Sequence, residues 1–322
     1  AHYQGRPLIV ITGDRPESYR GSGAPQAIEQ VGLFGNYVEG CDDLRRNGQS
    51  ALFGSWSGLR PWHINVCLEE DEAVPAVQVP ENDFEPVRRR RPAVTALIQF
   101  LQEDFRGLVV FLGGLRTEEQ EEAFYFLQQL GAPVVADATS GLRESLGKLV
   151  LTDGDRLLRQ QPPGKILRLG DVPTGRFWRD LESRPEIEVL SVTGTGFSGL
   201  ARESGVITGN VQDVLKGIGG APAIGDVLDL LPASLGRRGL LEELLEGYPD
   251  SEPGMMRVLS AYAATSESVF LGNSQPIREW NLSAQMHVPV RKVQASRGAN
   301  GIDGQVSTWV GATMGQDRAW GI

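Results

Sequence analysis

The stretch LVVFLGGLRTEEQEEAFYFLQQL, at residues 108–130, decides the fold of this chain. Its first five residues, Leu108–Leu112, form a short unbroken apolar run, which is typical of a strand. Gly113–Gly114 ends the run, and apolar residues then recur at helical spacing over Glu118–Leu130. We therefore predict a strand, a tight turn and a helix.

The same alternation continues along the chain. Strands are predicted at Pro133–Ala136, Lys165–Leu169 and Glu188–Val192, with a helix at Thr174–Leu181. Strands that alternate with helices indicate a parallel sheet with crossover connections. The predicted fold class is therefore α/β with parallel-sheet domains, including a complete, Rossmann-like central domain at residues 93–216.

Gly113–Gly114 also invites a dinucleotide-binding interpretation. That fingerprint needs a third glycine at the start of the helix and an acidic residue about 20 residues further on. The predicted helix contains no such glycine, although Asp137 lies near the required distance. A nicotinamide-dependent oxidoreductase remains an alternative, but a plain turn between strand and helix is favoured.

The first part of the chain resembles the end of another α/β unit. Leu8–Thr12 is predicted to be a buried strand, which Gly13–Pro16 ends. Ala27–Tyr37 has the apolar recurrence of a short amphipathic helix, and Trp62–Leu68 alternates as a strand does.

Two segments are expected to connect domains. Glu69–Pro92 is rich in Pro, Glu and Asp, and the basic run Arg88–Arg91 within it is expected to be solvated. Gly217–Gly254 is predicted to be a second linker with one or two short helices. From Met255 onward the pattern predicts helix, strand, helix, strand and helix.

Composition excludes several classes of function. The 322 residues are 40% apolar and 22% charged, which is ordinary for a soluble protein of two or more domains. The net charge is −10, without a continuous basic stripe, so no nucleic-acid partner is expected. No apolar run approaches the roughly 20 residues of a membrane helix. Cys41 and Cys67 are far apart and the chain has only three histidines, so we expect reduced thiols in a cytoplasmic protein and no metal site formed by these residues.

Two later turns are candidates for binding an anion. They read GNSQPIR at residues 272–278 and SRGANGIDG at residues 296–304, and each contains one arginine. Short predicted strands, Ser268–Leu271 and Lys292–Ala295, precede them. Because the backbone donors at a helix start favour anions, both turns are predicted to bind phosphate or carboxylate groups.

These turns resemble signatures of a thiamine-diphosphate-dependent family of menaquinone biosynthesis, the 2-succinyl-5-enolpyruvyl-6-hydroxy-3-cyclohexene-1-carboxylate synthases. Three further segments resemble the family in the same order, namely ITGDRP at residues 11–16, APQAI at 24–28 and WHINV at 62–66. The resemblance extends from near Pro7 to near Gly315 and is strongest at these motifs.

The resemblance implies a cytoplasmic transferase that uses thiamine diphosphate and Mg²⁺. Its substrates would be 2-oxoglutarate, which loses carbon dioxide, and isochorismate, to which the remaining carbons are joined. Family members are expected to form homodimers or homotetramers. The implied domains are the C-terminal part of a pyrimidine-binding-type domain (1–75), a linker (76–92), the central domain (93–216), a linker (217–254) and the start of a diphosphate-binding-type domain (255–322).

The resemblance also implies roles for individual residues. The matched substrate-binding residues are Arg15, Gln26, Arg176, Asn273, Ser274, Arg278 and Arg297. Ser274 is also expected near the cofactor, and Ile302 matches a bulky residue beneath the bent cofactor. Pro25 replaces an asparagine common in the family, and Phe177 replaces a basic residue, so local substrate contacts differ there.

Two family features have no match in these 322 residues. They are the glutamate that activates the aminopyrimidine and the Gly-Asp turn that holds magnesium. The resemblance therefore predicts an internal piece of a longer enzyme that binds neither cofactor nor metal and is inactive alone. The alternative from a different class is a non-catalytic α/β module that binds an anionic metabolite through Arg116, Arg143 and Arg168.

Overall fold

The computed structural model describes residues 1–45, 52–68, 94–102, 107–290 and 292–322. The chain divides into two compact units, Ala1–Arg90 and Arg91–Ile322. The predicted linker at 76–92 and the basic run Arg88–Arg91 lie outside the described residues.

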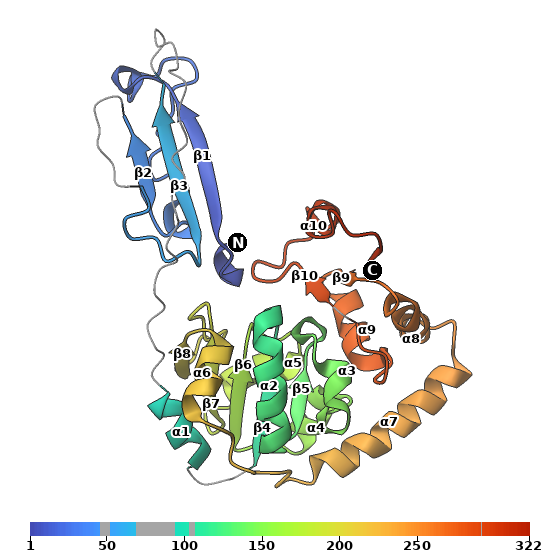
Figure 1. Cartoon of the computed structure of the whole chain (residues 1–322). Coiled ribbons are helices and arrows are strands. Elements are labelled where there is room, and N and C mark those ends of the chain that lie inside the picture. The colour runs from blue at the N-terminus through green and yellow to red at the C-terminus, as the bar shows by residue number, and fades with distance from the viewer. Residues whose placement is uncertain (46–51, 69–93, 103–106, 291) are drawn as a thin grey trace. The chain divides into compact units, whose positions relative to one another are not determined.

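The first unit contains a three-stranded parallel sheet in the order β1-β3-β2 (Figure 1). Its strands are β1 (Leu8–Asp14), β2 (Cys41–Leu44) and β3 (Pro61–Cys67). Both strands predicted in this part of the chain form, but the prediction that Leu8–Thr12 is buried is wrong, because Leu8, Ile9 and Ile11 are 49%, 42% and 68% exposed. Three short 3₁₀ turns accompany them, at His2–Gln4, Glu17–Tyr19 and Gly35–Tyr37.

The predicted helix at Ala27–Tyr37 is wrong, because only the 3₁₀ turn Gly35–Tyr37 forms there. Gly32 has a φ of 80°, which is incompatible with a right-handed helix. Ile28 and Val31 are 58% and 47% exposed, so the apolar residues that recur at helical spacing are not buried here. Periodicity without a surface to cover is not enough to form a helix.

A polar network fills the interior of this first sheet. His63 is fully buried, and its ring nitrogens contact Thr12 Oγ1 at 2.8 Å and Cys41 Sγ at 3.2 Å. Thr12 Oγ1 also donates to Asn65 Oδ1 at 2.8 Å. Burial lowers the pKa of His63 and raises that of the Cys41 thiol. His63 is therefore a hydrogen-bonded core residue, and both cysteines are free, half-buried thiols as predicted.

Arg20 extends this network, because its guanidinium forms ion pairs with two carboxylates. Its Nη2 lies 2.9 Å from Asp14 Oδ2 and 2.8 Å from Asp43 Oδ1. Hydrogen bonds from Arg20 hold the pKa of the Asp43 carboxyl well below its usual range. Asn65 Nδ2 donates to the same two carboxylates, each at 3.0 Å.

The second unit begins with a five-stranded parallel sheet in the order β5-β4-β6-β7-β8. Its strands are β4 (Leu108–Leu112), β5 (Val134–Ala136), β6 (Lys165–Leu169), β7 (Glu188–Thr193) and β8 (Gly205–Thr208). The helices are α1 (Thr95–Gln102), α2 (Thr117–Leu130), α3 (Arg143–Leu146), α4 (Gly154–Gln160), α5 (Arg176–Asp180) and α6 (Val211–Ile218). The α/β class with parallel sheets is confirmed.

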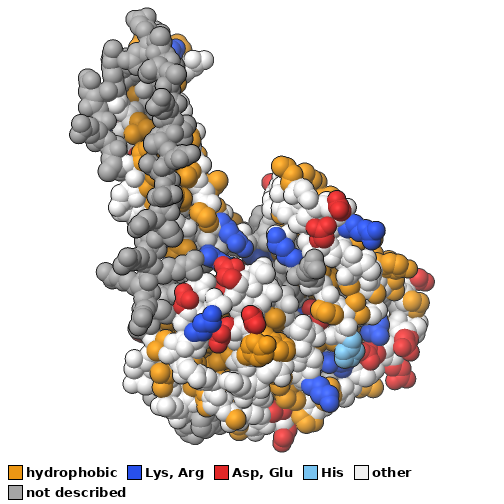
Figure 2. Space-filling model, viewed as in Figure 1, with side chains coloured by type: hydrophobic (Ala, Val, Ile, Leu, Met, Phe, Trp, Pro, Cys, Tyr) orange, Lys and Arg blue, Asp and Glu red, His pale blue; other side chains and the backbone are white. Residues whose placement is uncertain are grey.

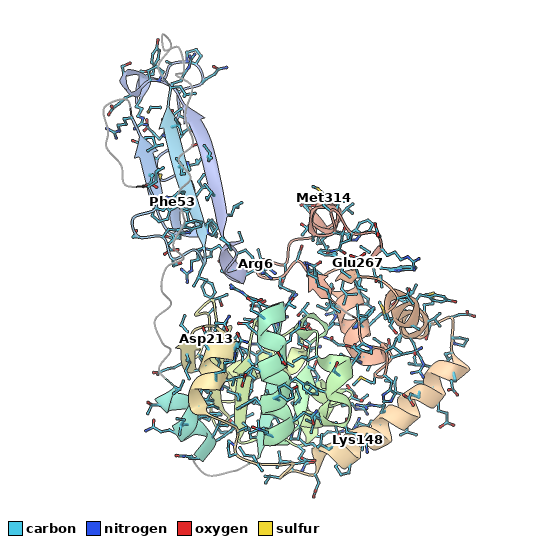
Figure 3. All side chains as sticks on the ribbon, viewed as in Figure 1. Arg6, Phe53, Lys148, Asp213, Glu267 and Met314 are labelled. Atoms are coloured by element: carbon cyan, nitrogen blue, oxygen red, sulfur yellow. The ribbon has the colours of Figure 1, made fainter. Side chains whose placement is uncertain are left out.

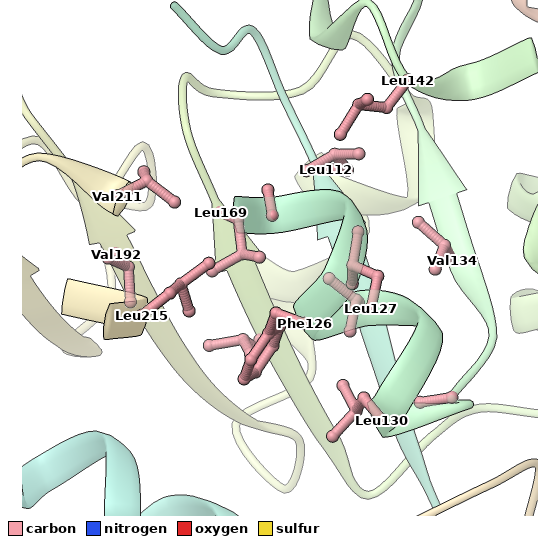
Figure 4. Close-up of a cluster of buried hydrophobic side chains, with 14 of the residues drawn as sticks. Leu112, Phe126, Leu127, Leu130, Val134, Leu142, Leu169, Val192, Val211 and Leu215 are labelled. Carbon is pink, nitrogen blue, oxygen red and sulfur yellow. The ribbon is translucent and has the colours of Figure 1, made fainter. Parts of the chain in front are cut away.

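Both faces of this sheet are covered, which explains the apolar run in β4. Val110 and Leu112 belong to a cluster formed with α1, α2 and α6 (Figure 4). Val109 and Phe111 point to the opposite cluster, where Phe177 and Trp178 of α5 pack. Every residue of β4 is therefore buried, and an alternating pattern would leave polar groups in a core.

The glycine pair after β4 allows two backbones to approach closely. A Cβ on Gly113 would lie 1.9 Å from the carbonyl oxygen of Asp171, and Asp171 N–H donates to Gly114 O at 3.0 Å. The Asp137 carboxylate accepts hydrogen bonds from Thr139 and Thr174. The space beside Gly113 is thus filled by protein backbone, which favours the plain turn over a nucleotide site.

The region from Met255 onward forms a second parallel sheet in the order β10-β9-β11. Its elements are α8 (Glu252–Ala263), β9 (Ser268–Leu271), α9 (Gln275–Ser283), β10 (Val293–Ala295), α10 (Gln305–Ala312) and β11 (Ala319–Gly321). The predicted order of helices and strands is confirmed, with β11 added. Ala138, from the turn after β5, lies in the same core as Val269 and Trp280, so the two sheets of this unit share buried surface.

One helix of 18 residues, α7 (Leu230–Gly247), replaces the one or two short helices predicted for 217–254. Polar contacts attach it to the central sheet domain: Ser234 Oγ accepts from Thr152 N–H at 2.7 Å, and Arg238 Nη2 donates to Val150 O at 2.9 Å. Leu240 and Leu244 remain 69% and 54% exposed. The helix is thus attached along one side.

The buried His63 predicts a pH dependence of stability for the first unit. Its folded pKa lies below the ordinary value of 6.5, so the unfolded chain binds the proton more readily. The stabilisation is present above pH 6.5 and is lost as the pH falls toward the folded pKa. Hydrogen exchange of β3 amides, corrected for intrinsic rates, should show weaker protection at pH 5.5 than at 7.5.

The matched control is His287→Gln, which removes an exposed histidine and should leave that pH dependence unchanged. His63→Gln should flatten it. Equal β3 protection at both pH values in the unmodified chain would contradict the prediction.

Candidate functional site

The two glycine-rich turns start from neighbouring strands. β9 and β10 pair in parallel, with Val269 opposite Val293 and Leu271 opposite Ala295. Since the carboxyl ends of parallel strands meet at one edge of a sheet, residues 272–274 and 296–304 leave the sheet side by side. In open α/β sheets, ligands bind at this edge.

Asn273 and Gln305 connect the two turns directly. The Asn273 N–H donates to Gln305 Oε1 at 2.7 Å, and its side-chain Nδ2 donates to Gly301 O at 3.2 Å. Gln305, the first residue of α10, also donates from Nε2 to Ile302 O at 3.3 Å. The structure therefore brings Asn273 together with the loop that contains Ile302. Sequence reasoning did not single out Gln305.

Ser274 has an uncommon backbone conformation at the start of α9. Its φ and ψ are 75° and −102°, a region that non-glycine residues rarely occupy. Such strain is worth about 1–3 kcal/mol and is concentrated at binding sites. Arg278, one turn into the helix, donates from Nη2 to Ser274 Oγ at 3.0 Å. A helix start and an arginine thus meet at Ser274, as an anion site requires.

Arg297 and Ile302 lie in the second turn. Arg297 is half-buried and Arg278 is exposed. Ile302 is 84% exposed, so it is not a core residue at the opening of α10. A branched apolar side chain exposed in a glycine-rich turn is a candidate for contact with a ligand or another chain.

Arg176 is the first residue of α5 and is exposed. Its backbone N–H donates to Asp155 Oδ2 at 2.7 Å, which anchors the start of the helix. Thr174, two residues earlier, accepts a hydrogen bond from Asn281 Nδ2 of α9 at 3.0 Å. The loop that precedes Arg176 is therefore bound to the helix that contains Arg278.

Arg15 and Gln26 belong to the first unit, after the carboxyl end of β1. Arg15 N–H donates to Asp14 Oδ1 at 2.9 Å, and its guanidinium lies 5.7 Å from the centre of the Tyr19 ring. Gln26 is exposed and has a φ of 63°, a second uncommon backbone conformation at a predicted site residue.

Two arginines of the alternative anion-sensing site have protein partners of their own. Arg143 is 3% exposed and donates to the carbonyls of Asn281 and Ala284. Arg168 is fully buried, donates to Phe197 O at 2.6 Å, and has its pKa lowered to about 10 by that burial. The structure therefore assigns Arg143 to holding α9 rather than to an open site.

The described residues also limit other kinds of site. Among them, no group of three or more His, Cys, Asp or Glu side chains is placed to hold a metal ion. None of the described helices is both long and apolar enough to cross a membrane. A groove of about 400 Å³ lies at the amino ends of β7 and β8 and is lined by none of the predicted site residues. On the face drawn in Figure 2, basic and acidic side chains are interspersed.

Comparison with known proteins identifies relatives over the whole chain. No family model matches. A 2-succinyl-5-enolpyruvyl-6-hydroxy-3-cyclohexene-1-carboxylate synthase of Akkermansia muciniphila is 46% identical, covering 100% of this chain and 61% of the relative. The synthase of the same name from Bdellovibrio bacteriovorus is 38% identical, covering 99% and 62%. That of Bacillus pumilus is 28% identical, covering 97% and 60%.

The chain thus spans about three fifths of the length of the curated relatives that it matches. The aligned span is not confined to the turns from which the resemblance was recognised, since it covers the whole chain. Over the span that they share, the chain is similar to 2-succinyl-5-enolpyruvyl-6-hydroxy-3-cyclohexene-1-carboxylate synthases.

Proposed function

We propose that this chain is part of a thiamine-diphosphate-dependent synthase of menaquinone biosynthesis. The enzyme would be a cytoplasmic transferase that decarboxylates 2-oxoglutarate and joins the remaining four-carbon unit to isochorismate. The observation that carries the proposal is the 46% identity over the whole chain to a synthase of that name. The adjacent turns after β9 and β10, which contain the matched motifs, support it.

The chain as a whole has a net charge of −10, which would repel substrates that carry several carboxylates. Because that charge is largely screened beyond a Debye length of about 8 Å at physiological salt, arginines close to the substrate would supply the attraction. The guanidinium fork binds two carboxylate oxygens at once, which lysine does not do. We assign this role to Arg278, Arg297 and Arg176 in the second unit, and to Arg15 with Gln26 in the first.

Asn273, Ser274 and Ile302 would line the cofactor side of the same region. Thiamine diphosphate supplies the electron sink that protein side chains lack, and this is its chemical part in a decarboxylation. Ser274, at the start of α9, is placed to hydrogen-bond substrate or cofactor. Ile302 is exposed, so its side chain is available to support a bound cofactor from below. These assignments fit the donor set and the exposure of the turns.

We expect the 322-residue chain by itself to give no turnover and to hold neither thiamine diphosphate nor Mg²⁺. The reason is that the family's activating glutamate and its magnesium-binding turn have no match among these residues. The test is a product assay with cofactor, Mg²⁺ and both substrates. Appreciable product from this chain alone would show that the assignment of the missing parts is wrong.

Arginine-to-lysine changes test the proposed substrate contacts. In the synthase that contains this chain, Arg278→Lys or Arg297→Lys should lower kcat/KM by about 10- to 100-fold, since a lost charge-assisted bond is worth about 1.5–3 kcal/mol. Steady-state kinetics with each substrate varied in turn measures the effect.

The matched control for these changes is Arg179→Lys, an exposed arginine of α5 outside the proposed site. It should behave as the unmodified enzyme does. Full activity in both Arg278→Lys and Arg297→Lys would exclude these residues from substrate binding.

We also propose that α10 contributes to a homo-oligomeric contact. Val306 and Val310 are four residues apart on α10 and are 72% and 55% exposed, and Met314, just beyond the end of the helix, is 78% exposed (Figure 3 labels Met314). Residues spaced by four lie on one side of a helix, so the two valines form a short apolar stripe. A stripe of this kind is suited to packing against a second copy in a dimer or tetramer.

A charge placed in the stripe tests this contact. Val306→Glu and Val310→Glu should shift the oligomer toward monomer, because a carboxylate buried at an interface is unpaired. Sedimentation velocity over a concentration series of the synthase measures the shift. Thr308→Glu, exposed on the other side of α10, is the control and should associate normally. Unchanged association in both valine variants would remove α10 from the interface.

A further inference from the structure

A partly buried polar contact joins α9 to the carboxyl edge of the central sheet. Asn281 Oδ1 accepts the backbone N–H of Ala138 at 2.7 Å, and Asn281 Nδ2 donates to Thr174 Oγ1 at 3.0 Å. Thr174 Oγ1 in turn donates to Asp137 Oδ2 at 2.6 Å. One side-chain amide therefore connects the turn after β5, the loop after β6 and the helix α9.

Arg143 reinforces this contact from α3, which lies beside α9 in Figure 1. Its guanidinium donates to Asn281 O at 3.0 and 3.1 Å and to Ala284 O at 3.2 and 3.3 Å. These carbonyls belong to the last turn of α9, where a cation is favoured. Glu144 pairs with Arg143 at 2.9 Å and accepts Trp280 Nε1 at 3.3 Å. The far half of α9 is thus fixed to the central sheet domain.

The contact lies between two of the proposed substrate-binding arginines. Arg278 precedes Asn281 by three residues on α9, about 4.5 Å along a helix axis at 1.5 Å per residue. Arg176, the first residue of α5, follows Thr174 by two residues. The hydrogen bond from Asn281 to Thr174 therefore limits how far the start of α5 and the helix that contains Arg278 can separate.

We propose that Asn281 is a positioning residue that holds Arg176 and Arg278 at the spacing required by a substrate with more than one carboxylate. This inference rests on the proposed function and adds to it a role for the central domain. Asn281 would not touch the substrate. Arg176 is anchored separately, because its backbone N–H donates to Asp155. Losing the bond from Asn281 to Thr174 would therefore let α9, with Arg278, shift relative to Arg176, so that binding weakens while the chemistry on a bound substrate is unchanged.

Two changes break the contact from opposite sides. Asn281→Asp keeps an acceptor for Ala138 N–H but removes the donor to Thr174 and adds a charge near Asp137. Thr174→Val removes the hydroxyl without changing α9. Thr174→Ser restores the hydroxyl and is the matched control. A folding defect would appear as a lower thermal midpoint, which is measured for all three.

The first readout is hydrogen exchange in this chain as it stands. In Asn281→Asp and Thr174→Val, the amides of α9 from Arg278 to Ser283 should exchange at least tenfold faster. The amides of Arg176 and Phe177, which donate to Asp155, and those of α2 should be unchanged. Thr174→Ser should match the unmodified chain. If the α9 amides are unaffected in both variants, the contact does not hold α9 and the proposal is overturned, whatever the activity.

The second readout is kinetics in the synthase that contains this chain. Asn281→Asp and Thr174→Val should raise KM for the multiply charged substrate about tenfold or more, with kcat within twofold. In an Arg176→Ala background, neither change should add a further effect, because the residue that they position is absent. Additive losses, or a fall in kcat alone, would overturn the positioning role. If the unmodified synthase makes no product, the proposed function fails instead, and the exchange result still decides whether the contact of Asn281 with Thr174 holds α9.

Discussion

The parallel pairing of β9 with β10 is the constraint on which the candidate site depends. It brings the ends of two glycine-rich turns to one edge of a sheet, although 20 or more residues separate them along the chain. The turns are then held together by Asn273 and Gln305 rather than by a charged pair. Neither Arg278 nor Arg297 takes part in these hydrogen bonds.

The central sheet domain contributes through its attachment to α9. Ala138 and Trp280 share one apolar core. Arg143 and Glu144 of α3 form a buried ion pair with each other, and across the same boundary Arg143 donates to Asn281 O and Ala284 O while Glu144 accepts from Trp280 Nε1. A buried ion pair adds little net stability, but these directional bonds constrain the helix. The central sheet domain thus helps to determine where α9, with Ser274 and Arg278, is held.

Agreement between sequence pattern and structure is best where an apolar run is buried on both faces. β4 and β6 have the bounds predicted, because residues 108–112 and 165–169 pack in the centre of a sheet covered by helices on each side. Agreement fails where packing is one-sided or missing. Ala27–Tyr37 has helical spacing without a surface to cover, whereas α7 forms over a stretch with three glycines because Ser234 and Arg238 bind it to its neighbour.

The sequence alone determined the α/β class, the order of most strands and helices in the second unit, and the resemblance to the synthases, because buried apolar runs and turn motifs are local properties. The attachment of α9 to the loop before Arg176, the strain at Ser274 and the exposure of Ile302 were decided only by the tertiary structure. Each depends on contacts between residues far apart in the chain. Asn281 and Thr174 are 107 positions apart, so no local sequence pattern predicts their hydrogen bond.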